Sequence, residues 1–329
     1  MGNIDDIKMA ADTCQKMVDE IGEVFVGNRD ILKKLLAAGI ANGHVLLEDY
    51  PGVGKTLLVK AIAKTIGCDY TRIQFTPDLL PADIIGTRIW KQKEGVFELM
   101  KGPIFTNILL ADEINRTPPK TQAALLEAMG ERQVTIEGIR HTLQSPFFAM
   151  ATQNPIDQEG TYPLPEAQMD RFLLKLSVGY AASLEEESTI LSRRIAWQKE
   201  DPIGDMKPVI TAEEFVHLQQ LAETSIYVDQ CILDYVSQIV RDTRKHPKAE
   251  VGSSPRGGLA LLKLARSMAV INGRDFVTPD DIKMFCIETL SHRIILHIEY
   301  ALDDVKGQDI VNEVMQDIPV PVDYMPRKK

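Results

Sequence analysis

Short apolar runs alternate with helical patterns through the first half of the chain. Each run spans five or six residues, and the segments between the runs carry apolar residues three and four positions apart, as in amphipathic helices. This alternation is typical of a parallel sheet covered by helices on both faces. The predicted strands are His44–Glu48, Tyr70–Phe75, Asn107–Ala111, Phe147–Thr152 and Phe172–Leu176.

Two further segments alternate between apolar and polar residues with a period of two around a glycine turn. They are Arg88–Leu99, with Glu94-Gly95 at the turn, and Gln133–Leu143, with Glu137-Gly138 at the turn. Such alternation around a tight turn is typical of a β-hairpin. We therefore expect two hairpins inserted in the α/β part of the chain.

Strand signals fade from about residue 184, while helical periodicity remains. Thr278-Pro279 is a typical helix start, since threonine caps the first N–H groups and proline fits the first turn. The pattern predicts an α/β unit over residues 1–183 and a smaller all-helical unit with an extended tail over residues 184–329. Helices are predicted at 5–24, 30–41, 55–67, 118–130 and 165–170, and then at Leu184–Trp197, Ala212–Ser225, Asp229–Lys245, Pro255–Asn272 and Thr278–His292.

The stretch after the first predicted strand carries the most chemical information. Backbone N–H groups of a glycine-rich turn at a helix start bind polyphosphate, and the helix dipole favours its negative charge. Lys55 would contact the terminal phosphates, and the Thr56 hydroxyl would bind Mg²⁺. The residues predicted to bind a nucleoside triphosphate here are Pro51, Gly52, Val53, Gly54, Lys55, Thr56 and Leu57.

Asp49 departs from the usual phosphate-loop signature, G-x-x-x-x-G-K-[ST], whose first glycine falls at this position. Aspartate adopts the left-handed backbone conformation more readily than most non-glycine residues, so the turn is compatible with it. A carboxylate beside the phosphates would weaken binding. We therefore expect an Asp49→Gly change to leave ATP affinity unchanged or to tighten it.

Two other predicted strands end in polar residues that suit the same site. Asp112 and Glu113 follow one buried strand, and Asn154 follows another. Ligands of doubly wound sheets bind at the carboxyl ends of the strands. Asp112 would bind Mg²⁺ through water, while Glu113 would orient and deprotonate the attacking water. Asn154 would hold that water or contact the terminal phosphate.

Composition narrows the class of protein. The hydrophobic fraction of 44% and the charged fraction of 26% are typical of soluble globular proteins. A net charge of −10 argues against a general DNA-binding surface. Apolar runs stay well short of the roughly 20 residues of a membrane helix. The 4 cysteines are far apart, which favours buried thiols in a reducing cytoplasm.

Four further blocks of the sequence are distinctive: Asp112–Arg116, Ala151–Pro155, Leu164–Gln168 and Asp170–Phe172. With these blocks the chain resembles the MoxR family of AAA+ ATPases over most of residues 20–180, and more weakly to about residue 300. The phosphate loop and the Asp-Glu pair are common to AAA+ proteins, whereas the four blocks are more selective for MoxR. The resemblance implies a P-loop AAA+ core with a five-stranded parallel sheet and inserted hairpins, followed by a helical lid domain.

The resemblance also implies roles at matching positions. Asn154 would be sensor 1, Arg171 an arginine finger for the neighbouring subunit's nucleotide, and Arg256 sensor 2 in the lid. Val26 and Gly27 would lie near the adenine. A planar, permanently charged guanidinium suits the charge that develops on the γ-phosphoryl group. Besides Arg171, Arg116 is a second candidate for the dominant interface arginine.

These inferences favour an ATP-hydrolysing enzyme that forms a homo-oligomeric ring, with a hexamer as the usual AAA+ size. The resemblance implies a chaperone-like role on partner proteins, often with von Willebrand factor A domains, in metal insertion or complex assembly. Two alternatives stay open. Asp49 favours a slow ATP-binding switch, and a nucleic-acid motor or loader is kept open by the basic hairpin residues Arg88, Lys91, Lys93 and Arg140.

Overall fold

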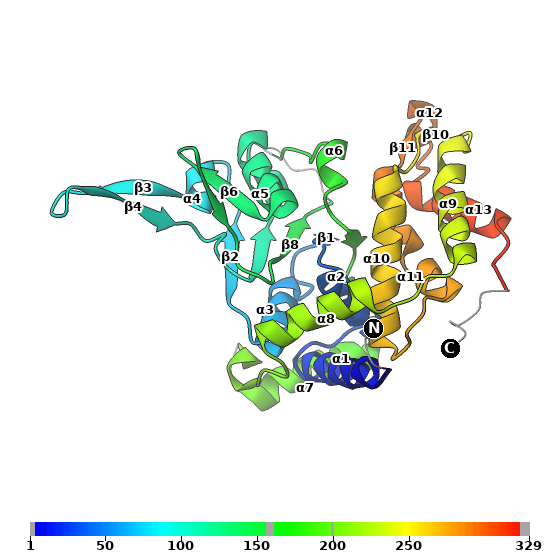
Figure 1. The fold of residues 1–329 in the computed structure, drawn as a ribbon, viewed down its shortest axis with the longest axis horizontal. Coiled ribbons are helices and arrows are strands. Elements are labelled where there is room, and N and C mark those ends of the chain that lie inside the picture. The colour runs from blue at the N-terminus through cyan, green and yellow to red at the C-terminus, as the bar shows by residue number, and fades with distance from the viewer. Residues whose placement is uncertain (1–3, 156–160, 199–200, 323–329) are drawn as a thin grey trace.

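The computed structural model describes residues 4–155, 161–198 and 201–322 (Figure 1). At its centre lies a parallel sheet with the strand order β2-β5-β8-β1-β9. All five predicted strands are confirmed, with ends that differ by one or two residues. They are β1 (Val45–Glu48), β2 (Tyr70–Gln74), β5 (Ile108–Asp112), β8 (Phe148–Gln153) and β9 (Leu174–Leu176).

Helices cover both faces of the sheet because its strands are apolar on both sides. In β5, Ile108 and Leu110 join one hydrophobic cluster, while Leu109 and Ala111 join another on the opposite face. The first cluster contains α1 (Ile4–Val24), α2 (Arg29–Ile40) and α3 (Lys55–Thr65). The second contains α5 (Pro119–Glu131) and residues of both hairpin regions. Between β8 and β9 lies the short helix α6 (Glu166–Met169).

Both predicted hairpins are present. The first, β3 (Gly86–Lys91) with β4 (Val96–Lys101), follows the short helix α4 (Pro81–Ile85) and projects far from the rest of the molecule (Figure 1). The second pairs β6 (Gln133–Ile136) with β7 (Ile139–Thr142) directly after α5. An ion pair of 3.8 Å between Arg88 and Glu137 links the two hairpins.

The second half is helical, as predicted, with one addition. The predicted helices appear as α7 (Leu184–Trp197), α8 (Ala212–Thr224), α9 (Gln230–Lys245), α10 (Pro255–Ile271) and α11 (Pro279–Leu290). The expectation that this half is all-helical is corrected by an antiparallel pair, β10 (Ala249–Val251) with β11 (Ile295–Leu296). Two more helices were not predicted, α12 (Ile298–Leu302) and α13 (Gly307–Asp317). The part of the chain that the structure describes also contains three short 3-10 turns: η1 (Ile114–Arg116), η2 (Pro202–Asp205) and η3 (Ser291–Arg293).

The core is continuous across the expected domain boundary at residues 183 and 184. Helix α10 packs against α1 and α2 as well as against α8, α9 and α11. Met17 of α1 and Leu264 of α10 are both completely buried in the same cluster. The division into a core of residues 1–183 and a helical lid of residues 184–329 therefore stays a proposal. The last residues of the predicted tail, 323–329, lie outside the described residues.

Candidate functional site

The phosphate loop joins β1 to α3 in a backbone conformation that requires glycine at two positions. Gly52 and Gly54 have φ angles of +88° and +83°, which side chains rarely adopt. Gly54 is the N-cap of α3 and supplies no side-chain hydrogen bond to the first turn. The N–H groups of that turn therefore depend on another acceptor, as at an anion-binding helix start.

Lys55 is the first residue of α3, and its side chain folds back over the loop. Its ammonium donates hydrogen bonds to the carbonyl oxygens of Asp49 (3.0 Å) and Tyr50 (2.9 Å). Burial lowers the pKa of Lys55, while the nearby carboxylates of Asp49, Asp112 and Glu113 oppose that shift. This arrangement places a cation directly beside the loop.

Asp112 ends the buried strand β5 and is held from two sides. One carboxylate oxygen accepts from the guanidinium of Arg72 on β2, at 2.6 and 3.0 Å. The other accepts from the hydroxyl of Thr152 on β8, at 2.6 Å. Because β2 and β8 are the two neighbours of β5 in the sheet, these partners follow directly from the strand order. Asp112 is therefore fixed at the carboxyl edge of the sheet.

Glu113 leaves the strand in a left-handed conformation, with φ at +58°. Its N–H donates to the Thr152 hydroxyl at 2.8 Å, so one threonine orients both acidic residues. The Glu113 carboxylate accepts from the Gln74 amide at 2.7 Å and pairs with Arg116 at 3.1 Å. Arg116 is thus placed beside Glu113 in its own subunit, and its role at an interface stays a prediction.

These side chains share one cavity with the phosphate loop. Asp112, Glu113, Thr152 and Asn154 form its sheet side. The loop side is lined by Asp49, Pro51, Gly52, Gly54, Lys55, Thr56 and Leu57, and the remaining lining residues are Arg72, Gln74 and Gln153. Every phosphate-loop residue predicted from the sequence except Val53 therefore lines the same space as the predicted acids and Asn154.

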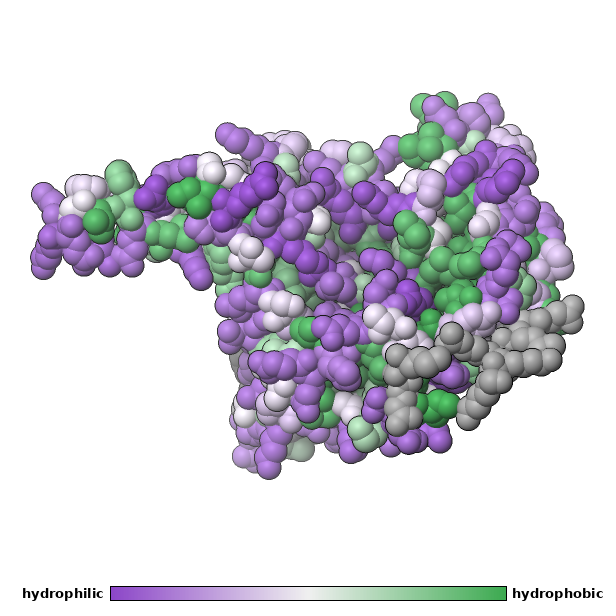
Figure 2. Space-filling view, in the orientation of Figure 1, coloured by the Kyte–Doolittle hydropathy of each residue, from purple (hydrophilic) through white to green (hydrophobic). Residues whose placement is uncertain are grey.

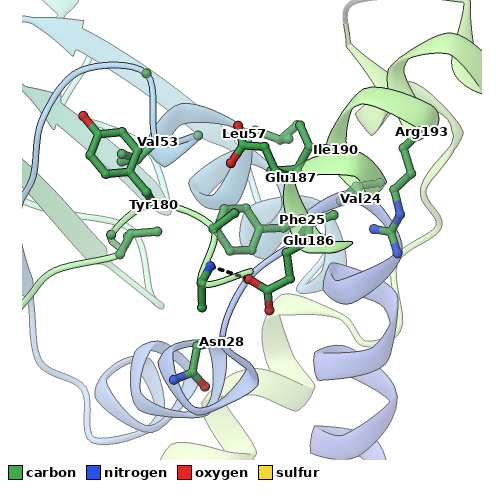
Figure 3. A pocket seen from close by; sticks show the side chains of 18 of the residues that line it. Val24, Phe25, Asn28, Val53, Leu57, Tyr180, Glu186, Glu187, Ile190 and Arg193 are labelled. Atoms are coloured by element: carbon green, nitrogen blue, oxygen red, sulfur yellow. Dashed lines mark hydrogen bonds between the residues drawn. The ribbon is translucent and has the colours of Figure 1, made fainter. Parts of the chain in front are cut away.

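A second cavity adjoins the first and shares Gly52, Gly54 and Leu57 with it (Figure 3). Val26 and Gly27, predicted to lie near the adenine, line this cavity together with Val53. Helix α7 and Tyr180 form other parts of its wall, and it has a volume of about 250 Å³. Its largely apolar lining and its position at the phosphate loop suit a nucleoside.

The donor set at the sheet edge fits a magnesium ion. The Thr56 hydroxyl and the Asp112 carboxylate line the same cavity, and both are the oxygen donors that Mg²⁺ prefers. Thr56 and Asp112 are therefore the residues that would hold the ion.

The structure corrects one expectation about Asp49, that its backbone is left-handed, and shows what its carboxylate binds. It is absent from the non-glycine residues with positive φ, so its backbone does not use the left-handed conformation. Its carboxylate accepts from the Ser177 hydroxyl (2.6 Å) and from the N–H groups of Val178 (2.7 Å) and Gly179 (3.0 Å). Asp49 lines the phosphate cavity with an exposed fraction of only 4%, and these three partners engage its carboxylate.

Arg171 and Arg256 lie together, but away from the phosphate cavity. Both line a third cavity, formed by the end of α5, α6 and the start of α10. Arg171 donates to the carbonyl of Leu126 at 2.7 Å, and Arg256 pairs with Asp170 at 3.1 Å. Asp170 also binds the buried Arg293 at 2.7 Å. Neither predicted arginine is among the residues that line the nucleotide cavities of its own subunit.

Sequence reasoning missed Arg72, Gln74 and Thr152 as parts of the site. A signal was present, because all three lie on strands next to β5. In the parallel register, Gln74 pairs with Asp112, and Thr152 lies one residue beyond the last paired position of β8. A predicted strand order would have identified them.

Family models match the chain in two places and define its class. Residues 44–174 match the "ATPase family associated with various cellular activities (AAA)", and residues 241–314 match the "AAA lid domain". A crystal structure of a protein from Cytophaga hutchinsonii has a TM-score of 0.88, with 37% identity, and the alignment covers 96% of this chain and 98% of the other. The protein is therefore an AAA+ ATPase by fold, with an α/β core and a helical lid.

Curated relatives narrow the class to a family. The chain is 52% identical over 307 residues to the uncharacterized protein YeaC of Bacillus subtilis, covering 93% of this chain and 94% of that protein. It is 40% identical over 329 residues to chaperone MoxR1 of Mycobacterium tuberculosis, covering 97% and 85%. The chain belongs to the MoxR family of AAA+ ATPases.

In the described residues, helices are too short or too polar to cross a bilayer.

Proposed function

We propose that this protein hydrolyses ATP with Mg²⁺ as a homo-oligomeric ring, with a hexamer as the expected size, and uses the reaction to remodel or mature a partner protein. The single observation that carries the proposal is the division of the charged machinery between two cavities. The phosphates would be bound at one, while Arg171 lies at another on the same subunit.

Within the phosphate cavity, each side chain has a position that suits one task. Lys55 binds the terminal phosphates, and Asn154 contacts the γ-phosphate or the attacking water. Glu113, which lines the same cavity, accepts a proton from that water. Thr56 and Asp112 would hold a magnesium ion, which would neutralise charge on the phosphate oxygens.

The described lining of the phosphate cavity contains one guanidinium, Arg72, and it is bound to Asp112. Besides Lys55 and a bound magnesium ion, a guanidinium for the charge that develops on the transferred phosphoryl group would therefore come from outside this cavity. Arg171 is exposed and suits that role for a neighbouring subunit. Because Arg256 lines the same cavity as Arg171, we assign it to the neighbour's nucleotide as well.

The projecting hairpin supports a protein client. Five of its large apolar side chains are 42–60% exposed, and apolar groups gather on this arm (Figure 2). They are Ile89, Trp90, Val96, Phe97 and Met100. Exposed apolar patches of this kind mark protein interaction sites. The name of the relative MoxR1 also favours a chaperone role. A von Willebrand factor A domain protein is the client class that the family resemblance implies.

The contacts of particular residues weigh against the two alternatives, although Lys93 and Arg140 keep their part in the nucleic-acid alternative. On the projecting hairpin, Arg88 lies near Glu137, and Lys91 pairs with Glu94 and Glu98, so acids offset the basic charge that a nucleic acid would need. The slow-switch alternative rests on a carboxylate beside the phosphates, and the Asp49 carboxylate is engaged by Ser177, Val178 and Gly179.

The proposal is tested by mixing two inactive variants. Arg171→Ala keeps an intact phosphate cavity but lacks the finger, and Glu113→Gln keeps the finger but lacks the base. Alone, each is expected to lose about 10³-fold or more of the ATPase rate. Mixed in equal amounts, they form rings in which one subunit's Arg171 acts on the other's Glu113, and the rate rises well above either alone.

The wild-type rate per subunit should also climb with protein concentration, since hydrolysis needs a neighbour. Arg241→Ala, which changes an exposed arginine of α9, is the matched control and should behave as wild type. A wild-type rate independent of concentration, together with no recovery on mixing, would contradict the assignment of Arg171 to a neighbour.

A further inference from the structure

Asp49 joins two segments that are far apart in the chain. It begins the phosphate loop directly after β1, and its three hydrogen-bond donors lie on the segment that leaves β9. The three donor–acceptor distances, 2.6 to 3.0 Å, are those of well-formed bonds to a charged group. The carboxylate therefore holds the start of the loop against residues 177–179.

The residues that follow these bonds meet at the nucleoside cavity. Tyr50, next to Asp49, stacks on Tyr180, next to Gly179, with ring centroids 6.2 Å apart and an interplanar angle of 11°. Tyr180 lines the nucleoside cavity together with Val178 and Gly179 (Figure 3). The wall of this cavity and the phosphate loop are thus connected through one carboxylate.

We propose that Asp49 is a positioning residue for the nucleotide: it fixes the wall that faces the base to the loop that holds the phosphates. This inference rests on the proposed ATP site. The carboxylate touches neither base nor phosphate, and acts by keeping both halves of the site in one arrangement before ATP arrives. An apparent dissociation constant rises in proportion as the binding-competent arrangement becomes less populated.

The arrangement reverses the expectation from the sequence that glycine would suit position 49 better. Asp49 has no positive φ, so a glycine there gains nothing from its conformational freedom. Asp49→Gly removes all three bonds. Ser177 and Gly179 are exposed, so water replaces the lost acceptor and the protein still folds. What the variant loses is the link between the two segments.

The test measures MgATP binding by calorimetry, and KM and kcat by phosphate release, on the full-length protein. If the competent arrangement falls to about a tenth in Asp49→Gly, Kd and KM rise about tenfold. At saturating ATP, kcat stays within about twofold of wild type, because bound ATP restores the arrangement. Asp49→Asn retains one acceptor oxygen and should lie between the two.

A double-mutant cycle with Ser177→Ala identifies the route of the effect. Ser177→Ala should raise Kd in the wild-type background and have no effect in the Asp49→Gly background, since the serine acts through the carboxylate. Asp281→Asn is the structural control, because Asp281 is a buried aspartate that binds Arg274 far from both cavities. It should lower the thermal midpoint and leave KM for ATP unchanged.

The outcomes separate this inference from the proposed function. Wild-type binding that is lost in Lys55→Ala but unchanged in Asp49→Gly overturns the role of Asp49 alone. Fully additive effects of Asp49→Gly and Ser177→Ala, or a fall in kcat at unchanged KM, overturn it too. A wild-type protein that binds no ATP overturns the proposed function together with this inference.

Discussion

The buried side chain of His44 predicts how the free energy of unfolding changes with pH. The ring lies just before β1 with an exposed fraction of 4%. Its Nδ1 accepts from the N–H of Ala149 at 3.0 Å, so its Nε2 carries the proton and donates to the carbonyl of Met129 at 3.0 Å. A second proton would have to enter at Nδ1, against the N–H that it accepts. The folded protein therefore holds His44 neutral.

Burial first, and then the nearby charge of Arg132, lower the pKa of His44 from 6.5 to about 3, while the Met129 carbonyl opposes the shift. Between pH 6.5 and pH 3 the unfolded chain binds a proton at this site and the folded chain does not. The free energy of unfolding therefore falls as pH falls, by about 1.4 kcal/mol per pH unit from this site. At pH 5 the loss from His44 is about 2 kcal/mol.

The assay is urea unfolding at pH 7.5 and pH 5.0, followed by circular dichroism. Between pH 7.5 and pH 5.0 the free energy of unfolding should fall by about 2 kcal/mol more in wild type than in His44→Gln, because glutamine cannot be protonated. Burial also lowers the pKa of His292, which adds a loss of the same sign to both proteins and cancels in the difference. His297→Gln, at an exposed histidine, is the control and should match wild type. Equal losses in wild type and His44→Gln would refute the reasoning.

Three further changes test the nucleotide site. Lys55→Ala should abolish ATP binding in calorimetry, since it removes the cation beside the loop; retained binding would contradict the phosphate-loop assignment. Glu113→Gln should bind ATP, hydrolyse it at a small fraction of the wild-type rate and favour a stable ring in sedimentation, and normal turnover would exclude it as the base. Thr152→Val leaves the Asp112 carboxylate and the Glu113 N–H without their shared partner, so the unfolding free energy should fall by about 1–3 kcal/mol. Thr152→Ser, which keeps the hydroxyl, should recover most of that loss, and an equal loss in both variants would rule out the hydrogen bonds as its cause.

Much of the fold could be predicted because its strands are short, apolar and bounded by turns. A strand such as β5 is buried on both faces, and nothing but a run of apolar residues satisfies that environment. The hairpins were equally readable, since glycine turns at Gly95 and Gly138, with φ of +65° and +82°, separate alternating runs. The pair β10–β11 was missed because strands of two or three residues are too short to establish alternation.

The candidate site also contains residues that local sequence indicates and contacts that it does not indicate. Residues whose predicted roles depend on local sequence, such as Lys55 and Glu113, line one cavity. The partner of Asp49 lies 128 residues away, and no local pattern indicates that contact. Arg256 is similar, since its position beside Arg171 depends on how α10 packs against the core. The spacing of residues along the sequence indicates their chemical roles, whereas these contacts depend on tertiary packing.

The packing of α10 against α1 and α2 determines how a movement at the proposed ATP site would be transmitted to the rest of the subunit. Swinging the lid open would expose the buried side chains that α1 and α10 share, and each 100 Å² of apolar surface costs about 2.5 kcal/mol. Motion at this boundary is therefore limited to small sliding of packed helices. A subunit that turns as one body moves each point in proportion to its distance from the axis. The β3–β4 arm reaches farthest from the lid (Figure 1), so a small rotation about an axis near the lid would displace the tip of this hairpin the most.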